Sequence, residues 1–537
     1  MKRTAVAAIA LVGGSVLAPA TPAQAQEWRA PQRVSAAGVP VSSAVGALRP
    51  DGTASVAMQA TVAQGVPFTS IQVADRSLNG AWAAPILLSD RGLDARAPAI
   101  GAGSALTCAA WDQEVGPFHQ VRVACKANAG WGASQAIGDD FGSITDLDVA
   151  VAANGRSVVT ALAYSTEMDR QTIIASTLQA GVWSAPQALS SVDAHGGATF
   201  TQVDVEARAD GSFVAAWSGD GGVASSSLGA RSAAFDRVSI RGARPALFEV
   251  VVSAGDAATV LWSERDDTGI RTLHYSQYRG LAWTPDRVID DEWATEAIRP
   301  TGEFAAAADP DGSITVAWAE VEPDGSAIGS FVVPSSAAAV VRDGNPIASG
   351  PGWMGAPALA ADGRGGFHVL FARGRTPFVD QSMQSTYYAS PAQRILAGDS
   401  HEVEPQQATR LVTQAMLHSG RALLAVWLKA TAGGNEVWAA SWLDPGTPAP
   451  VQAASDRPGS LIVRWGTPRD GALPDGYVVQ VRVAGARVWK EVGRTAGNAR
   501  SLRVNGLVSG RTYEARVAGL LGTIPGDWSL LARAVLR

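Results

Sequence analysis

Eight residues between positions 96 and 353 have side chains of the kinds that bind or cleave carbohydrates and other polar ligands. They are Trp293, Trp353, Arg96, Arg244, Arg299, Asp290, Asp291 and Glu292. Two carboxyl groups that face each other can act as acid and base, or as nucleophile, in glycoside cleavage. Arginine binds anionic groups, and indole rings offer flat apolar surfaces. We take all eight as ligand-binding candidates and assign no catalytic residue, because solvated loop charges and turn caps are the simpler explanation of the carboxylates and arginines.

Other common site chemistries lack the residue spacing that they need. The six histidines are scattered, without a His-Glu-x-x-His or a Cys/His metal pattern. A Gly-x-Ser-x-Gly elbow, a phosphate-binding loop and a dinucleotide fingerprint are also missing. We therefore expect no cofactor. Calcium at the acidic loops of Asp139, Asp140 and residues 290–292 is the alternative.

The composition indicates a protein built from short strands and tight turns. Of 537 residues, 57 are glycine and 17 are tryptophan, and only 17% are charged, which excludes a disordered or coiled-coil protein. The formal charge of −6 argues against a general polyanion binder, so we expect no nucleic-acid partner.

A repeat of about fifty residues accounts for most of the chain. Short apolar strands end in Trp111, Tyr164, Trp217, Trp262, Trp318, Phe371 and Trp427, and an earlier copy ends in Met58. Successive copies are 45 to 56 residues apart. Asp-Gly or Asn-Gly turns precede several of these strands, and a second turn carries a tryptophan that is often followed by proline. Four strands in about 50 residues is the size of a β-propeller blade.

The two ends of the repeat region complement each other. The eighth unit stops at Pro445 without a fourth strand, while Trp28-Arg29-Ala30-Pro31 repeats the Trp-x-x-Pro pattern of Trp82 to Pro85. We therefore predict an all-β, eight-bladed propeller over residues 26–445, in which the N-terminal strand closes the last blade. Seven blades is the alternative.

Most tryptophans are expected to pack between blades, because they recur at fixed positions of the repeat. Trp293 and Trp353 break this pattern and lie in predicted loops. Because strand direction alternates, the loops after second and fourth strands share one face, and these loops are long and varied. We expect the binding site on this loop-rich face.

The repeat resembles secreted bacterial propellers of sialidase-like or kelch-like architecture. Sialidases use arginines and carboxylates on such a face, but their Ser-x-Asp-x-Gly-x-x-Trp box is absent. Asp311-Gly312-Ser313 before Trp318 has its Asp and Gly adjacent. The resemblance therefore implies an architecture, and no sialidase catalytic residue is carried over.

The N-terminus has the features of an export signal. A basic start, a run of small apolar residues and the small-x-small pattern Ala23-Gln24-Ala25 predict a signal peptide over residues 1–25. We expect a secreted, extracellular protein without a membrane span, and a monomer. Cys108 and Cys125 lie symmetrically about Gly116-Pro117, so a hairpin there would pair them in a disulfide, with two buried thiols as the alternative.

The last 87 residues follow a different pattern. After a linker at 446–450, residues 451–537 resemble a fibronectin type III domain. Trp465 lies where that fold has its core Trp, Tyr477 on the following strand, and Leu507 to Tyr513 matches the Leu-x-x-Gly-Thr-x-Tyr corner with Arg511 in the usual Thr position. The resemblance implies a seven-stranded sandwich. This domain carries a net charge of +7, and residues 26–445 carry −15.

The sequence thus predicts an extracellular binding protein that recognises a glycan or a protein through the loop-rich face. A secreted glycosidase or other carbohydrate-active enzyme is the alternative, and a structural surface scaffold is a further one. The basic tail is the part expected to contact an anionic cell-wall polymer.

Overall fold

The computed structural model contains strands and turns in every described segment. It describes residues 28–537 apart from positions 29, 63–66, 78–79, 128–129, 180, 194–198, 221, 231–234, 240–244, 253–256, 266–270, 280–281, 290–298, 309–311, 323–324, 336–340, 343–346, 362–365, 376–380, 390–400, 408–410, 420–421, 444, 469–473 and 522–523. Within these bounds the chain is all-β. The same residues include no helix with the length and apolarity needed to cross a membrane.

Residues 32–443 form a series of antiparallel sheets of four or five strands, built from consecutive hairpins except that the N-terminal β1 joins the last sheet. The first four sheets contain β2 (Val41–Leu48), β3 (Ala54–Val62), β4 (Phe68–Arg76) and β5 (Ile86–Leu87); β6 (Ala95–Ala102), β7 (Thr107–Val115), β8 (Phe118–Ala127), β9 (Gly130–Trp131) and β10 (Gln135–Phe141); β11 (Ser143–Val151), β12 (Ser157–Ser165), β13 (Arg170–Gln179), β14 (Val182–Trp183) and β15 (Gln187–Asp193); and β16 (Phe200–Ala207), β17 (Phe213–Gly219), β18 (Gly222–Leu228) and β19 (Asp236–Ser239).

The later sheets repeat this order. They contain β20 (Pro245–Val252), β21 (Ala258–Arg265), β22 (Arg271–Arg279), β23 (Ala282–Trp283) and β24 (Arg287–Val288); β25 (Arg299–Ala308), β26 (Ile314–Glu322), β27 (Gly325–Val333), β28 (Val341–Arg342) and β29 (Ala348–Gly350); β30 (Trp353–Ala361), β31 (Gly366–Gly374), β32 (Gln381–Ala389) and β33 (His401–Gln407); and β34 (Leu411–Ser419), β35 (Ala422–Thr431), β36 (Gly434–Leu443) and β1 (Gln32–Arg33).

Local sequence explains the turns within each sheet. Gly52, Gly155 and Gly211 in the first hairpins have φ between 82° and 85°, a conformation that favours glycine over other residues. The fourth strand is split at Pro186, between β14 and β15. Proline has no N–H to donate to the ladder, so pairing stops there and resumes after it.

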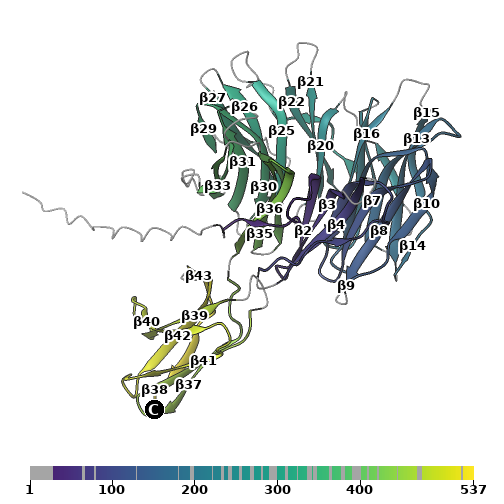
Figure 1. The fold of residues 1–537 in the computed structure, drawn as a ribbon. Coiled ribbons are helices and arrows are strands. Elements are labelled where there is room, and N and C mark those ends of the chain that lie inside the picture. The colour runs from purple at the N-terminus through teal and green to yellow at the C-terminus, as the bar shows by residue number, and fades with distance from the viewer. Residues whose placement is uncertain are drawn as a thin grey trace, which may run out of the picture.

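The sheets pack face to face in a propeller-like arrangement (Figure 1). The first strand of each sheet contacts the first strand of the next, from β2 through β6, β11, β16, β20, β25 and β30 to β34, and β34 in turn contacts β2. Each first strand also has a register shift against its second strand, and in most of the sheets this β-bulge lies near the beginning of the first strand. A bulge bends a strand and redirects its side chains.

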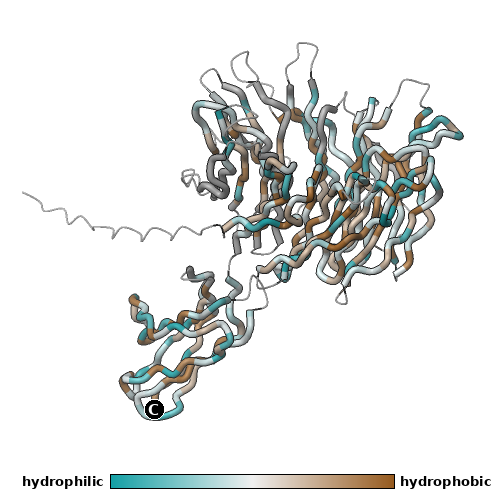
Figure 2. The backbone as a smooth tube through the Cα atoms, viewed as in Figure 1, coloured by the Kyte–Doolittle hydropathy of each residue, from teal (hydrophilic) through white to brown (hydrophobic). Residues whose placement is uncertain are grey.

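Large aromatic side chains fill the space between sheets, as the repeat predicts. Trp111, Trp217, Trp262 and Trp318 are each the fifth residue of a second strand and are at most 3% exposed. Figure 2 shows hydrophobic residues concentrated along the strands. One predicted repeat position was wrong: Ala161 is the fifth residue of β12, and Tyr164 lies nearer the strand end, where its hydroxyl donates to Asp169.

The N-terminal segment is joined to the end of the repeat region. β1 pairs antiparallel with β36, and beyond it Val34 N–H donates to the Val437 carbonyl over 2.8 Å. Val34 is 2% exposed in a cluster that includes β2, β3, β35 and β36. Trp28 packs against a second cluster containing Leu370 and Trp427.

Cys108 and Cys125 form the predicted disulfide between directly paired residues of β7 and β8. The described sequence has no free cysteine.

The C-terminal residues form two further sheets, drawn in yellow-green and yellow in Figure 1. One contains β37 (Val451–Arg457), β38 (Ser460–Trp465) and β41 (Ser501–Asn505); the other contains β39 (Gly476–Val483), β40 (Lys490–Ala496), β42 (Thr512–Leu521), β43 (Ile524–Trp528) and β44 (Ala532–Val535). Trp465 and Tyr477 pack together in the core with ring centroids 5.3 Å apart. The hydroxyl of Tyr513 accepts the N–H of Val508, as in a tyrosine corner.

Candidate functional site

Several of the predicted binding residues lie outside the described part of the chain. These are Arg244, Asp290, Asp291, Glu292 and Trp293. Arg299 begins β25, but its side chain is also outside what the structure describes. Arg96 and Trp353 are the two candidates that can be placed.

Arg96 is held in a fixed position at the beginning of β6. Its Nε donates to the Asp112 carboxylate over 2.7 Å, and its Nη2 lies 3.2–3.3 Å from the ring nitrogens of His119. Asp112 is fully buried, whereas the Arg96 side chain is 50% exposed. His119 Nδ1 lies 2.9 Å from the other Asp112 oxygen. One tautomer satisfies both contacts of His119: Nδ1–H donates to Asp112, and Nε2 accepts from Arg96.

The backbone beside Arg96 is unusual. Ala97 has φ of 51°, a left-handed conformation that is uncommon for a residue other than glycine. It lies within the β-bulge between Arg96 and Ala99, and its N–H donates to the side chain of Gln59 on β3 over 3.2 Å. Such strain at a bulge persists when neighbouring contacts fix the chain, and it is common at functional sites. The bulge and the buried Asp112 together determine where the Arg96 guanidinium points.

Trp353 is the first residue of β30 and is half-buried. Its indole lies over Gly355, where a β-carbon would collide with the ring. This contact favours packing at the strand end. No described contact joins Trp353 to Arg96, so the two placed candidates do not form one site.

His274 lies in a second histidine–carboxylate cluster, which was not predicted from the sequence. Its ring stacks on Trp262 with centroids 5.6 Å apart, and its Nδ1 lies 3.1 Å from Asp286. Glu264 accepts the Trp262 indole N–H over 2.8 Å. Within the described residues, no group of three or more His, Cys, Asp or Glu side chains is arranged to hold a metal ion.

A row of acidic residues between first strands was also missed by sequence reasoning. This carboxylate seam consists of Asp146 and Asp148 on β11, Asp204 and Glu206 on β16, and Glu249 on β20. Asp146 and Asp148 accept the N–H groups of Val203 and Val205 over 2.8 and 3.0 Å, and Asp204 accepts that of Val250 over 2.8 Å. The first strands β16 and β20 thus have N–H groups satisfied by carboxylates of the preceding sheet.

The environment of Asp146, Asp204 and Glu249 favours the protonated carboxyl. Burial raises the pKa of Asp146 to about 6. It raises the pKa of Glu249 to about 8, with Glu206 adding a smaller repulsion. Burial followed by repulsion from Asp148 raises the pKa of Asp204, and the two carboxyls share a hydrogen bond. Glu206 is exposed, whereas Glu249 is partly buried. We therefore expect the ionisation of Glu206 to change the stability of the fold less than the ionisation of Glu249.

The seam geometry favours a structural role over glycoside cleavage. A hydrogen-bonded carboxyl pair such as Asp148 and Asp204 is closer together than the separation of about 5 Å or more that glycosidases use. The oxygens of Asp146, Asp148 and Asp204 are also engaged with backbone N–H groups. We therefore assign the seam to the joining of neighbouring sheets.

The C-terminal domain presents a stack of alternating tryptophan and arginine side chains. The Arg516 guanidinium lies 4.2 Å from the Trp528 ring and 4.3 Å from the Trp489 ring, and Arg482 lies 4.3 Å from Trp489. The buried Glu514 binds Arg482 on one side and Arg533 on the other, each over 2.7 Å. The hydrogen bond from Arg482 is the main cause that lowers the pKa of Glu514. These contacts hold several cations together on one sheet of the sandwich.

The fibronectin-like resemblance of the tail is confirmed. Residues 446–532 match the family model of the fibronectin type III domain. The match begins within the segment predicted to be a linker. Comparison with curated proteins finds no match for the chain.

Solved structures offer broader but weak similarities. A protein of unknown function from Dyadobacter fermentans aligns over 77% of this chain and 98% of its own, with 8% identity and a TM-score of 0.38. An ulvan lyase from a new family of polysaccharide lyases aligns over 66% and 94%, with 9% identity and a TM-score of 0.43. The α-L-arabinanase of Penicillium chrysogenum aligns over 65% and 92%, with 12% identity and a TM-score of 0.34. At these scores the similarities carry no argument about function.

Proposed function

We propose that this chain is an extracellular binding protein that recognises a glycan or a protein through the loop-rich face of a propeller. The observation that carries the proposal is the geometry of Arg96, a half-exposed guanidinium held by the buried Asp112. Its Nη1 has no partner among the described residues, and a cation fixed in advance loses little conformational freedom on binding. The ligand group that suits it is a carboxylate or sulfate.

The proposed propeller has eight blades, and the N-terminal strand closes the last of them. Two observations support this count. The contacts between first strands run from β2 to β34 and back to β2, and β1 occupies the fourth place in the sheet of β34 to β36. In this arrangement Arg96 belongs to the second blade.

Replacing Arg96 by glutamine should weaken ligand binding. Arg96→Gln removes the charge but keeps a polar side chain, and we expect at least about a tenfold loss of affinity, as for a charge-assisted hydrogen bond. The measurement is a titration of the purified chain against the best hit of an array of acidic and neutral glycans.

Arg170→Gln is the matched control. Arg170 is at the beginning of the third strand β13, is similarly exposed and, among the described residues, pairs only with the exposed Asp193. Loss of affinity in both variants would indicate a general charge effect, and unchanged affinity of Arg96→Gln would refute the assignment of this residue. Release of new reducing ends from the bound glycan would favour the glycosidase alternative.

The Trp–Arg stack favours a second candidate function, in which the C-terminal domain holds the protein on an anionic polymer of the cell wall. Arg482 and Arg516 are kept in place by Trp489 and Trp528, and the domain has a net charge of +7. A fixed row of cations attracts a polyanion without needing a deep pocket.

The test of this second function is retention of the full chain on immobilised polyphosphate. Retention should fall steeply as ionic strength rises from 0.05 to about 0.5 M, because salt screens exposed charges. Arg516→Gln should elute at clearly lower salt than the wild type. Arg464→Gln, an equal charge change on β38 of the other sheet, should elute close to the wild type. If both variants shift the eluting salt concentration equally, retention depends on net charge and not on the Trp–Arg stack.

A further inference from the structure

A cleft between the second and third sheets is lined in part by Cys125 of the disulfide. It has a volume of about 520 Å³, and its lining includes Leu106, Cys125, Ala133, Asn154, Leu178 and Trp183. We call it the disulfide cleft. It lies at the ends of the strands that carry the short turns, away from Arg96.

Comparison with the neighbouring pair of sheets explains why the cleft exists. In the first sheet, Asp75 pairs with Ser55 at the position that Cys125 and Cys108 occupy in the second. Asp75 binds Ser55 over 2.6 Å, Trp131 over 3.1 Å and Lys126 over 3.0 Å, and so joins the first two sheets.

Between the second and third sheets this polar junction is replaced. Cys125 stands in place of Asp75, Trp183 in place of Trp131, and Leu178, which pairs with Trp183, in place of Lys126. A sulfur and a leucine cannot bridge the sheets as a carboxylate and an ammonium do. The space therefore stays open beside Cys125.

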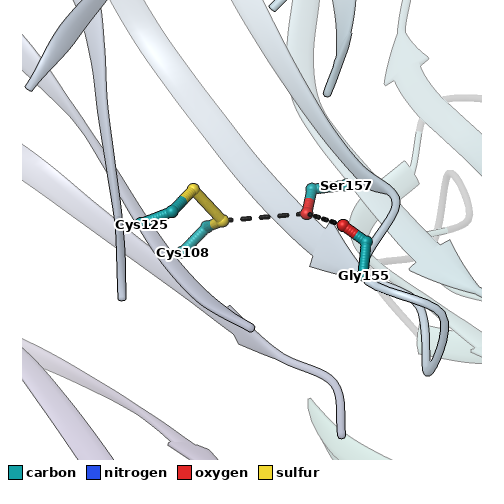
Figure 3. The surroundings of a disulfide bond; sticks show 4 residues. All are labelled: Cys108, Cys125, Gly155 and Ser157. Atoms are coloured by element: carbon teal, nitrogen blue, oxygen red, sulfur yellow. Dashed lines mark hydrogen bonds between the residues drawn. A yellow bond between two sulfur atoms is a disulfide. The ribbon is translucent and has the colours of Figure 1, made fainter. Parts of the chain in front are cut away.

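The two sulfur atoms differ in their surroundings. Cys108 is fully buried, whereas Cys125 keeps partial solvent contact and lines the cleft. Figure 3 shows Ser157 on the side of Cys108, with its hydroxyl oxygen 3.7 Å from the Cys108 sulfur. The same hydroxyl lies 3.4 Å from the Gly155 carbonyl, so its single hydrogen has two available acceptors.

We propose that Cys125 is a site of reversible modification by a small external thiol that enters the disulfide cleft. The thiolate attacks the Sγ of Cys125, and a new S–S bond forms there. The Cys108–Cys125 bond breaks, and its electron pair leaves on the sulfur of Cys108. The hydroxyl of Ser157 then turns from Gly155 and donates to this thiolate. Attack by Cys108 on the mixed disulfide restores the original bond and releases the thiol.

The direction of this exchange follows from access and from the leaving group. Thiol–disulfide exchange depends on which sulfur can be reached and on how well the departing thiolate is stabilised. The cleft exposes Cys125, and Ser157 stabilises Cys108. Both features therefore select the same direction.

The test uses the folded full chain and 2-mercaptoethanol, a small neutral thiol. After short exposure the reaction is quenched with acid, free thiols are alkylated, and the site of the adduct is read by peptide mass spectrometry. We expect the adduct on Cys125 and alkylation on Cys108, in at least about tenfold excess over the reverse. An adduct mainly on Cys108, an equal mixture, or no adduct below the unfolding transition would overturn the proposal.

Two variants test the mechanism independently of the adduct position. Ala133→Trp fills the cleft and should slow modification about tenfold, whereas Ala84→Trp, at the equivalent position of the first sheet, should leave the rate unchanged. Ser157→Ala should slow it about fivefold, because the departing thiolate loses a hydrogen bond. If the rate of modification follows global unfolding in urea and is the same in Ala133→Trp, the thiol does not reach Cys125 through the cleft.

Discussion

Removal of residues 27–36 from the chain lowers the melting temperature of the repeat region by about 5–10 °C. The deletion exposes the edge of β36, which now pairs with β1. It also removes Val34 from a cluster in which that residue is 2% exposed. Burying a valine contributes about 1.5–3 kcal/mol, and each lost backbone hydrogen bond adds about 1 kcal/mol. Thermal unfolding followed by circular dichroism measures the change.

Two point variants distinguish the loss of the buried Val34 contact from the loss of the whole N-terminal segment. Val34→Asp places a carboxylate in the cluster and should approach the effect of the deletion. Gln32→Asp changes an exposed residue of β1 two positions earlier and should be nearly neutral. If the deletion leaves the melting temperature unchanged, the N-terminal segment does not close the last sheet, and the proposed eight-bladed closure fails with it.

Raising the pH from 5 to 8.5 destabilises the protein, and Glu249 makes a large contribution to this loss. Burial raises the pKa of Glu249 from its ordinary value of 4.5 to about 8. Between these values the folded chain binds more protons than the unfolded chain, so stability falls as the pH rises. The contribution of Glu249 is complete below pH 4.5 and is lost as the pH passes through 8. It amounts to about 3 kcal/mol, since Glu249 keeps some solvent contact.

Melting curves at pH 5, 6.5 and 8.5 test this dependence. Glu249→Gln keeps an oxygen that can accept the Ala306 N–H, but its side chain cannot ionise. The melting temperature of this variant should therefore rise relative to that of the wild type as the pH rises. Glu167→Gln, in the exposed turn between β12 and β13, should run parallel to the wild type at every pH. A wild type that becomes more stable towards pH 8.5 would show that the seam carboxyls are ionised in the folded state at neutral pH.

Patterns that act over short stretches of chain were readable from the sequence. The hairpins, the buried tryptophans of the second strands and the Cys108–Cys125 pair each depend on residues that are close in sequence or repeat at a fixed interval. The fibronectin type III domain was recognisable for the same reason, because Trp465, Tyr477 and Tyr513 lie at the positions expected of that fold. Tyr164 differs, because it lies near the interval of the repeat but is not the repeated residue, which is Ala161.

The carboxylate seam could not be read in the same way. Asp146-Leu147-Asp148 and Asp204-Val205-Glu206 alternate polar and apolar residues, which by itself predicts strands with one solvated face. Their role depends on backbone N–H groups 46 to 57 residues away on the next sheet. The pKa shifts follow from that packing, because burial between sheets is their main cause.

The sequence by itself determined the repeat, the disulfide pair and the character of the two regions, an acidic β-sheet array followed by a basic fibronectin type III domain. Arg96 was one of eight candidates, and only the fold shows that the buried Asp112 and the bulge at Ala97 hold it in place. The disulfide cleft appeared only when the second and third sheets were placed side by side. Hairpin pairing is set by local sequence, whereas these sites consist of contacts between sheets, and such contacts exist only once the whole array has packed.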